Sequence, residues 1–225
     1  MRILLIAGGW SSEREVSLSG AKGIASAITT LGHDLVPLDP SESFGRLCRE
    51  AAKADFAFIN MHGSPGEVGL IQAMLEKAGC PYQGAGPAGS FLALNKAASK
   101  QLYRLHGLPT PDWEYHPIQP KGFGQDWEPA LDLPVFVKPN NGGSSVDMGQ
   151  APDMERLTRL MAAIFAKGGE VLLETSVPGT ELTCAVLGEE PLPPILIKPG
   201  GGSTFFDYAS KYTPGGATEI CPAPV

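Results

Sequence analysis

The chain has 225 residues, of which 43% are hydrophobic and 18% charged, and its formal net charge is −7. This length can hold more than one domain, and the composition is that of a globular protein with a sizeable core. The acidic balance argues against nucleic acid as the main partner, because nucleic-acid binding requires a basic face. Locally placed lysines and backbone N–H groups must therefore hold any anionic ligand.

The cysteines and the apolar runs indicate the cellular compartment of the protein. Cys48, Cys80, Cys184 and Cys221 lie far apart and make no CxxC pair. This spacing argues against a zinc site or a disulfide framework and for a reducing compartment. The N-terminal "MRILLIAGG" is too short for a membrane span and has no small-residue cleavage site after it, so it is interpreted as a buried strand. We expect a cytoplasmic protein without membrane contacts.

The first part of the chain alternates between strand and helix patterns. Strands are expected at 2–7, 33–40 and 55–63, and helices at 16–32, 43–54 and 70–80. This alternation predicts an α/β layer with a parallel sheet. Ligands of such sheets gather at the carboxyl ends of the strands, where the loops "GGWSSERE" and "HGSPGEVG" fall.

From Gly84 onward the pattern becomes α+β. We expect a loop leading into a helix over 84–107, a surface linker over 116–134 and a helix over 153–169. Strands are expected at 134–139, 170–177, 180–188, 193–199 and 218–225, and those at 180–188 and 193–199 alternate like antiparallel strands. The long loop at 200–217 contains glycines, aromatics and a lysine, a composition more typical of function than of disorder.

Three lysines are candidates for binding an anion. Lys138 ends an apolar strand just before a run of Asn, Gly and Ser. A lysine there can simply reach the surface, Lys96 can lie on a solvated helix face, and Lys211 can be an ordinary loop residue. Together they offer three cations from three segments, which suits a triphosphate bound by an acidic protein.

The run after Lys138 is open to two interpretations. Its glycines let backbone N–H groups and the hydroxyls of Ser144 and Ser145 approach a phosphate, or they form an ordinary hairpin turn. Glu174 and Glu181 lie near strand ends, where they can accept hydrogen bonds from an adenine amino group or ribose hydroxyls, or be solvated.

Polar residues near the carboxyl ends of the first and third strands are candidates for a substrate site. Glu13 and Ser17 follow the first strand, and a helix-capping arrangement explains them as well as a binding site does. His62 ends the third strand and is either a core histidine or a contact for a substrate carboxylate.

Six motifs in one order resemble those of a known family. They are "GGWSSEREVSLSG", "NMHGSPGEVGLIQAMLEKAGCPYQGAG", "LALNKAASKQL", "LPVFVKPNNGGSSVDMG", "EVLLETSVPGTELTCAVLG" and "FFDYASKY" followed by "EICPA". In order and spacing they are similar to the D-alanine–D-alanine ligases of the ATP-grasp superfamily. The resemblance covers essentially the whole chain.

The resemblance implies a fold and an activity. It implies an N-terminal parallel α/β domain over 1–90, an ATP-grasp lid over 91–176 and an incomplete C-terminal ATP-grasp domain over 177–225. It also implies that two D-alanines are joined to D-alanyl-D-alanine for peptidoglycan synthesis, through an acyl phosphate. ATP and Mg²⁺, or alternatively Mn²⁺, would be required, and a homodimer built through the N-terminal region is expected.

The resemblance also implies residue roles in the substrate site. Glu13 is expected near the ammonium of the first D-alanine, hydrogen-bonded to Ser144 and Tyr212, and these three are the expected catalytic residues. His62 is expected near the carboxylate of that substrate. The aromatic loop from Phe205 to Pro214, which contains Tyr212, is expected to close over the site and exclude water.

The expected ATP-binding residues come from several segments. By resemblance Lys96, Lys138 and Lys211 reach the phosphates, and Glu174 and Glu181 bind adenine and ribose. Ser144 and Ser145 belong to the flexible flap over the phosphates. Tyr212 favours a dipeptide-forming enzyme over one that makes a D-lactate ester.

Four positions depart from the family pattern. Val68 stands where the family usually has an aspartate, Asp147 where it has a glycine and Thr175 where a lysine is common, and Trp10 is bulky within the first loop. Asp147 matters most, because an anion in a phosphate loop repels the ligand unless it points outward.

Members of the family continue beyond Val225 with an arginine for the oxyanion, the ligands of magnesium and a serine that holds the closing loop. We therefore expect a shortened chain, a prematurely ended gene product or part of a longer sequence, with no metal ligands of its own and no significant turnover alone. The alternatives to a D-alanine–D-alanine ligase are a non-catalytic fragment of one, and a ligase that takes D-serine or D-lactate as second substrate.

Overall fold

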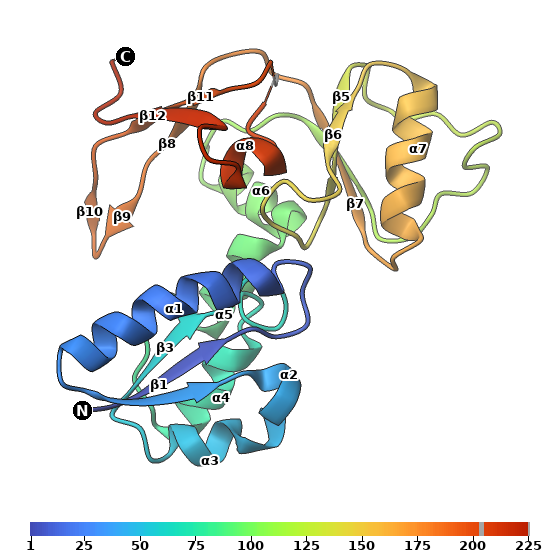
Figure 1. The fold of residues 1–225 in the computed structure, drawn as a ribbon. Coiled ribbons are helices and arrows are strands. Elements are labelled where there is room, and N and C mark those ends of the chain that lie inside the picture. Colours follow the sequence, from blue (N-terminus) through green and yellow to red (C-terminus); the bar gives the residue numbers. More distant parts are fainter. Residues whose placement is uncertain (203–204, 225) are drawn as a thin grey trace. The chain divides into compact units, whose positions relative to one another are not determined.

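The computed structural model describes residues 1–202 and 205–224 of the chain. The chain divides into two compact units, Met1–Leu108 and Pro109–Val225, each with its own sheets (Figure 1). Within the described ranges, none of the helices combines the length and the apolar composition needed to span a bilayer.

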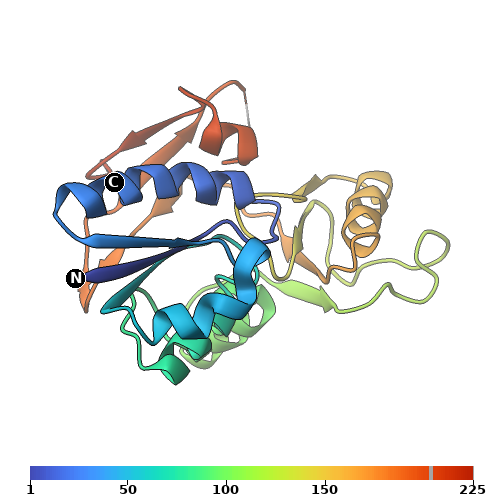
Figure 2. The same cartoon turned by 60° about the horizontal axis from the view of Figure 1, so that its bottom comes forward.

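The first unit is a three-layer α/β fold. Its elements are β1 (Arg2–Ala7), α1 (Arg14–Thr30), β2 (Asp34–Leu38), α2 (Pro40–Ser43), η1 (Phe44–Arg46), α3 (Leu47–Ala51), β3 (Phe56–Asn60), α4 (Leu70–Ala78), α5 (Pro87–Leu94) and α6 (Lys96–Leu105). The parallel sheet has the order β2–β1–β3. Figure 2 shows α1 on one side of this sheet and the segment from α2 to α4 on the other.

The middle strand is buried on both faces. Successive side chains of a strand point to opposite sides, so Ile3 and Leu5 pack with Ile28 of α1. Leu4 and Ile6 pack in the cluster that α3 and α4 form on the other face. A run that is apolar at every position is typical of a central parallel strand. The predicted strand at 2–7 and the parallel sheet are confirmed.

Helix boundaries in the first unit differ from the prediction in three places. α1 begins at Arg14, two residues before the predicted start. The segment predicted as one helix at 43–54 is divided among the end of α2, η1 and α3, and the last of these ends at Ala51. The predicted helix ending at 107 is two helices, because Asn95 is extended (φ −79, ψ 97) and its side chain accepts a hydrogen bond from the Ala98 N–H, which caps α6.

The second unit begins with an antiparallel sheet covered by one helix. Its elements are β4 (Trp113–His116), β5 (Val135–Pro139), β6 (Gly149–Ala151), α7 (Met154–Phe165) and β7 (Val171–Thr175). The strand order is β4–β7–β5–β6. α7 lies on one face, where Leu157 and Met161 are fully buried against Val137 and Leu173.

The remainder of the second unit is a smaller antiparallel sheet with attachments. Its elements are β8 (Glu181–Thr183), β9 (Val186–Leu187), β10 (Glu190–Pro191), β11 (Ile195–Pro199), α8 (Tyr208–Tyr212) and β12 (Ala217–Ile220). The sheet has the order β12–β11–β8, and β9 and β10 form a separate hairpin. The antiparallel arrangement predicted here is confirmed.

Four elements of the second unit were not predicted. β10 lies between the predicted strands at 180–188 and 193–199. β4 ends at the first residue of the predicted linker and forms because Trp113–His116 pairs with β7. β6 forms where the glycine-rich run returns along β5. α8 lies inside the predicted loop at 200–217 and is capped by the Asp207 side chain, which accepts from the Ser210 N–H at 2.8 Å.

Candidate functional site

The two central strands of the second unit present a polar face opposite their core face. Val135 and Val137 of β5 point into the core beneath α7, so the alternate residues Phe136 and Lys138 point the other way. On β7 the same alternation turns Glu174 to this face, and it is the register partner of Phe136. A cation, a carboxylate and an aromatic ring are therefore brought together by strand geometry alone.

A pocket of about 460 Å³ lies against this face. Its walls come from four segments of the second unit: Phe136 and Lys138 of β5; Ser145 and Met148; the stretch from Val177 to Glu181; and Phe205 and Phe206. Aromatic and apolar side chains dominate, with one lysine, one carboxylate and the two hydroxyls of Ser145 and Thr180. This combination suits a ligand with a flat base, a hydroxylated part and an anionic end.

Lys138 and Glu174 form an ion pair beside the pocket. Their side chains are 22% and 12% exposed, so the pair is largely removed from water. Lys138 also lies 5.8 Å from the centre of the Phe136 ring. The ammonium is therefore fixed by a carboxylate and a ring, and its position is defined before any ligand arrives.

The stretch from 140 to 148, here called the flap, has an unusual backbone. Ser144, Ser145 and Asp147 have φ angles of 52, 57 and 55, in the left-handed region that non-glycine residues rarely adopt. Strained backbone of this kind is more frequent at binding sites than elsewhere. It supports interpreting the glycine-rich run as a binding loop and not as a simple hairpin turn.

The flap contacts the segment 205–214, here called the closing segment. Ser144 Oγ and Tyr212 Oη lie 2.6 Å apart, and either hydroxyl can donate. Ser145 Oγ donates to the Phe206 carbonyl at 2.8 Å, and the Phe205 ring packs edge-on against Phe136 with centroids 5.4 Å apart. These contacts hold the flap and the closing segment together on the pocket side of β5.

The closing segment also carries Lys211. Its ammonium lies 5.2 Å from the centre of the Phe206 ring, and the Phe206 N–H donates to Glu181 Oε2 at 3.2 Å. Glu181 is thereby linked to the closing segment at the mouth of the pocket. Tyr208 and Tyr212 pack against each other with ring centroids 4.7 Å apart.

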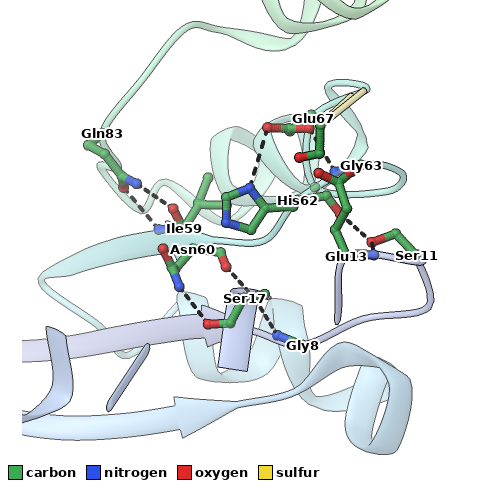
Figure 3. Close-up of polar contacts among 12 residues, drawn as sticks. Gly8, Ser11, Glu13, Ser17, Ile59, Asn60, His62, Gly63, Glu67 and Gln83 are labelled. Carbon is green, nitrogen blue, oxygen red and sulfur yellow. Dashed lines mark hydrogen bonds and ion pairs between the residues drawn. The ribbon is translucent and has the colours of Figure 1, made fainter. Parts of the chain in front are cut away.

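In the first unit, a second polar cluster lies at the carboxyl edge of the parallel sheet (Figure 3). Ser17 is fully buried; its hydroxyl accepts from the Gly8 N–H at 2.7 Å and donates to the Asn60 carbonyl. The Asn60 side-chain amide donates back to the Ser17 carbonyl at 2.7 Å. Ser17 is therefore no helix cap but joins the ends of β1 and β3 to α1.

Glu13 lies beside the loop that follows β3. Its side chain is nearly buried, it makes no side-chain capping bond to α1, and Figure 3 shows it next to Gly63. A Cβ on Gly63 would lie 3.4 Å from Glu13 Oε2 and 3.0 Å from the Ser11 Cβ, and Gly63 has a φ of 67. The glycine is thus required by both its backbone conformation and the closeness of Ser11 and Glu13.

His62 belongs to the same cluster. It is no core histidine, because its side chain is 34% exposed and its Nδ1 lies 4.0 Å from Glu67 Oε1. Ser11 Oγ donates to the His62 carbonyl at 2.6 Å, and Glu67 accepts from the Gly63 N–H at 2.7 Å. The first loop and the loop after β3 are therefore tied together around Glu13 and His62.

Asp39 anchors the first loop from the end of β2. It accepts from the Gly9 N–H at 2.9 Å, from the Ser41 hydroxyl at 2.7 Å and from Arg14 at 2.5 Å. Partial burial acts to raise the pKa of Asp39, but the hydrogen bonds from Gly9 and Ser41 and the charge of Arg14 outweigh it, so the pKa lies below its usual value. A Cβ on Gly8 would fall 2.2 Å from an Asp39 oxygen, so that position needs glycine.

Asp147, which was expected to repel a phosphate unless it points outward, forms an ion pair with Lys167. Lys167 Nζ lies 2.7 Å and 2.6 Å from its two carboxylate oxygens. Trp10, the other bulky departure, is 55% exposed and packs edge-on against Phe44, with ring centroids 5.7 Å apart. Neither side chain is among those that line the pocket.

The predicted residues fall into two groups. Lys138, Ser144, Ser145, Glu174, Glu181, Lys211 and Tyr212 come together in the second unit, and Glu13, His62 and Lys96 belong to the first. The predicted hydrogen bonds from Glu13 to Ser144 and Tyr212 join different units and stay a prediction. Among residues 1–202 and 205–224, no group of three His, Cys, Asp or Glu side chains is placed to hold a metal ion.

Sequence reasoning missed several pocket residues. These are Phe136, Met148 and the stretch from Val177 to Thr180, whereas Phe205 and Phe206 lie in the loop that was predicted to close over the site. The alternation in "VFVKP" could have revealed Phe136, since it shares a face with Lys138. The others depend on loop conformations that have no periodic signal.

Comparison with known proteins agrees with this geometry. A family model described as the D-ala D-ala ligase C-terminus matches residues 102–225. A D-alanine–D-alanine ligase of Nitratidesulfovibrio vulgaris is 60% identical over 225 residues, which are 100% of this chain and 73% of that protein.

Solved structures give the same result. The D-alanine–D-alanine ligase of Bacillus anthracis complexed with ATP superposes with a TM-score of 0.79 at 30% identity, over 98% of this chain and 70% of that one. The VanG D-Ala:D-Ser ligase of Enterococcus faecalis gives 0.74 at 27% identity, over 100% and 77% of the two chains.

The fold is that of the ATP-grasp class of ligases. Within that class, the sequence identity and the family model show that the chain belongs to the D-alanine–D-alanine ligase family. The resemblance drawn from the six motifs is confirmed.

Proposed function

We propose that the chain provides the ATP site and the first substrate site of an enzyme that joins two D-alanines for peptidoglycan synthesis. One observation carries the proposal. Lys138, fixed by Glu174, lies at a pocket with aromatic walls and a carboxylate at its mouth, in a member of this family. The aromatic walls suit the adenine base, Glu181 suits the ribose hydroxyls, and Lys138 and Lys211 suit the phosphates.

The chemistry needs a better leaving group than a carboxylate oxygen. The γ-phosphoryl group of ATP passes to a carboxylate oxygen of the first D-alanine, and ADP leaves. The amine of the second D-alanine then attacks the acyl carbon, and phosphate departs with the electrons of the broken C–O bond. Lys96, Lys138 and Lys211 offset the negative charge that the phosphates carry during transfer.

The remaining residues bind and shield the reactants. Glu13 would pair with the ammonium of the first D-alanine and His62 with its carboxylate. The flap and the closing segment, joined through Ser144 and Tyr212, would keep water from the acyl phosphate, which water would otherwise hydrolyse.

Several features of the whole enzyme also remain proposals. ATP is expected to act as its magnesium or manganese complex, but no three ligand side chains gather among the described residues, so no step is assigned to a metal here. The homodimer, the cytoplasmic location and the three-part division at 1–90, 91–176 and 177–225 are proposed from the family resemblance.

A chimera tests the function independently of where this chain ends. These 225 residues would replace the matching residues of the Nitratidesulfovibrio vulgaris relative, which is 60% identical over the same length. We expect ADP release that requires D-alanine, with D-alanyl-D-alanine identified by mass spectrometry. Its Lys138→Ala variant should lose this activity.

A chimera that folds and binds ATP but forms no dipeptide, beside an active parent, would contradict ligation. It would leave the alternative of a non-catalytic fragment.

The similarity to a D-Ala:D-Ser ligase favours one further candidate, a ligase that takes D-serine as its second substrate. A competition experiment decides between the two. With D-alanine, D-serine and D-lactate present together, we expect D-alanyl-D-alanine as the main product.

A further inference from the structure

A charged contact anchors the flap near its C-terminal end. Lys167 Nζ contacts both carboxylate oxygens of Asp147, at 2.7 Å and 2.6 Å. Asp147 has a φ of 55, a conformation that aspartate tolerates better than most residues. The side chains of Lys167 and Asp147 are 63% and 30% exposed.

The flap is anchored at its N-terminal end as well. Asn140 is fully buried, its N–H donates to the Glu170 carbonyl at 2.9 Å, and its side-chain amide donates to Glu170 Oε2 at 2.8 Å. The amide of Asn141 donates to the same oxygen at 2.9 Å. Glu170 therefore holds the point where the chain leaves β5.

Both anchors belong to one short connection. Lys167 and Glu170 lie between the end of α7 and the start of β7. The N–H groups of Lys167 and Gly169 bond to the Ile164 carbonyl, at 3.1 Å each, and Ile164 is buried in the core of the unit. The connection is thus fixed to a rigid helix and can fix the flap in turn.

We propose that Lys167 and Asp147 are positioning residues for phosphate binding. The pair turns the Asp147 carboxylate away from the phosphates, and it sets the backbone N–H groups of the flap to receive them. This inference rests on the proposed ATP site. Neither residue would touch the ligand.

An exposed ion pair contributes little to global stability. Removing it should therefore change the flap and the nucleotide affinity while the free energy of unfolding stays the same. If the ion pair only stabilised the fold, its removal would instead lower the free energy of unfolding and leave the flap and the nucleotide affinity unchanged. The distinction makes the inference testable on the chain itself.

The test compares Lys167→Ala with Lys167→Arg, and uses Lys121→Ala as a control. Lys121 is an exposed lysine of the same unit, so its loss makes the same change in net charge. Hydrogen exchange of the peptide containing 140–148 is measured without nucleotide, and ATP affinity by calorimetry. We expect faster exchange and roughly two- to fivefold weaker ATP binding in Lys167→Ala only, with Lys167→Arg close to wild type.

A double variant, Asp147→Asn with Lys167→Ala, should bind ATP no more weakly than Lys167→Ala alone, because the unpaired anion is gone. Unchanged exchange in Lys167→Ala, or faster exchange with unchanged ATP affinity, would overturn the inference. A wild-type chain that binds no ATP would instead overturn the proposed function, and the exchange rates would then decide whether the anchor exists.

Discussion

Lys138 illustrates how a strand can place a common residue at a candidate site. By sequence it could have been a strand-end lysine reaching for water. In the structure it points away from the core because Val135 and Val137 point into it, and Glu174 holds it from the next strand. A ligand phosphate would meet an ammonium that has already lost most of its freedom, which favours binding.

We expect Lys138→Ala to weaken ATP binding about 10- to 100-fold, roughly 1.5–3 kcal/mol for a charged hydrogen bond. Lys138→Arg should keep part of the affinity, since the charge remains. Calorimetric titration with ATP checks this, with Lys121→Ala as control. An affinity within twofold of wild type would show that Lys138 does not bind phosphate.

Asp39 gives a pH prediction of definite sign. Its pKa is lower in the folded chain than the usual 3.8, so the unfolded chain takes up its proton first as the pH falls. The stability that Asp39 contributes is present above pH 3.8 and is lost as the pH falls through the folded-state pKa.

Asp39→Asn should therefore lower stability at pH 7 by about 1–2 kcal/mol, because the bonds from Arg14 and Gly9 weaken. It should also flatten the fall in stability below pH 4. Urea unfolding at several pH values measures both effects. If the free energy of unfolding of the variant fell with pH as steeply as that of the wild type, the role given to Asp39 would be contradicted.

At the scale of elements, periodic segments could be predicted from the sequence and the others could not. β1, the parallel sheet and α7 follow from apolar patterns that need no tertiary information. β4 and β6 are short and exist because they pair with β7 and β5. The division of 84–107 at Asn95 depends on a side-chain cap, which a helical pattern does not reveal.

The candidate site divides in the same way. Lys138, Glu174 and Glu181 could be selected because they end or begin strands, whereas Phe205 and Phe206 lie in a segment without periodicity. The Asp147–Lys167 pair joins residues 20 positions apart in two loops, and no sequence pattern indicates it. The six motifs led to the family because their order and spacing carry information that helix and strand propensity alone does not.

The stability of the core beneath the pocket should be sensitive to the shortening of a buried side chain. Leu173 is fully buried between β7 and α7, so Leu173→Ala should destabilise the second unit by about 2–5 kcal/mol. Leu182→Ala is a matched control, because Leu182 is 44% exposed and its loss should cost less than about 0.5 kcal/mol. Denaturant unfolding of both variants, compared with wild type, measures the difference, and equal effects would contradict the packing.

For the molecule as a whole, the functional residues are distributed over two units with separate cores. The first presents Glu13 and His62 at the carboxyl edge of a parallel sheet, and the second presents a pocket on an antiparallel one. The proposed reaction needs ATP and D-alanine bound at once, but ATP binding to the pocket of the second unit can be tested without D-alanine.

Photolabelling with 8-azido-ATP followed by peptide mapping tests that property most directly. The second unit has another pocket, of about 480 Å³, against the outer side of α7 near Gly124 and Thr158, which serves as an internal comparison. We expect the label on peptides containing Phe136, Met148, Val177–Glu181 or Phe205, with competition by ATP and a strong reduction in Lys138→Ala. Label confined to the pocket beside α7, or labelling that ATP does not reduce, would contradict the assignment of the nucleotide site.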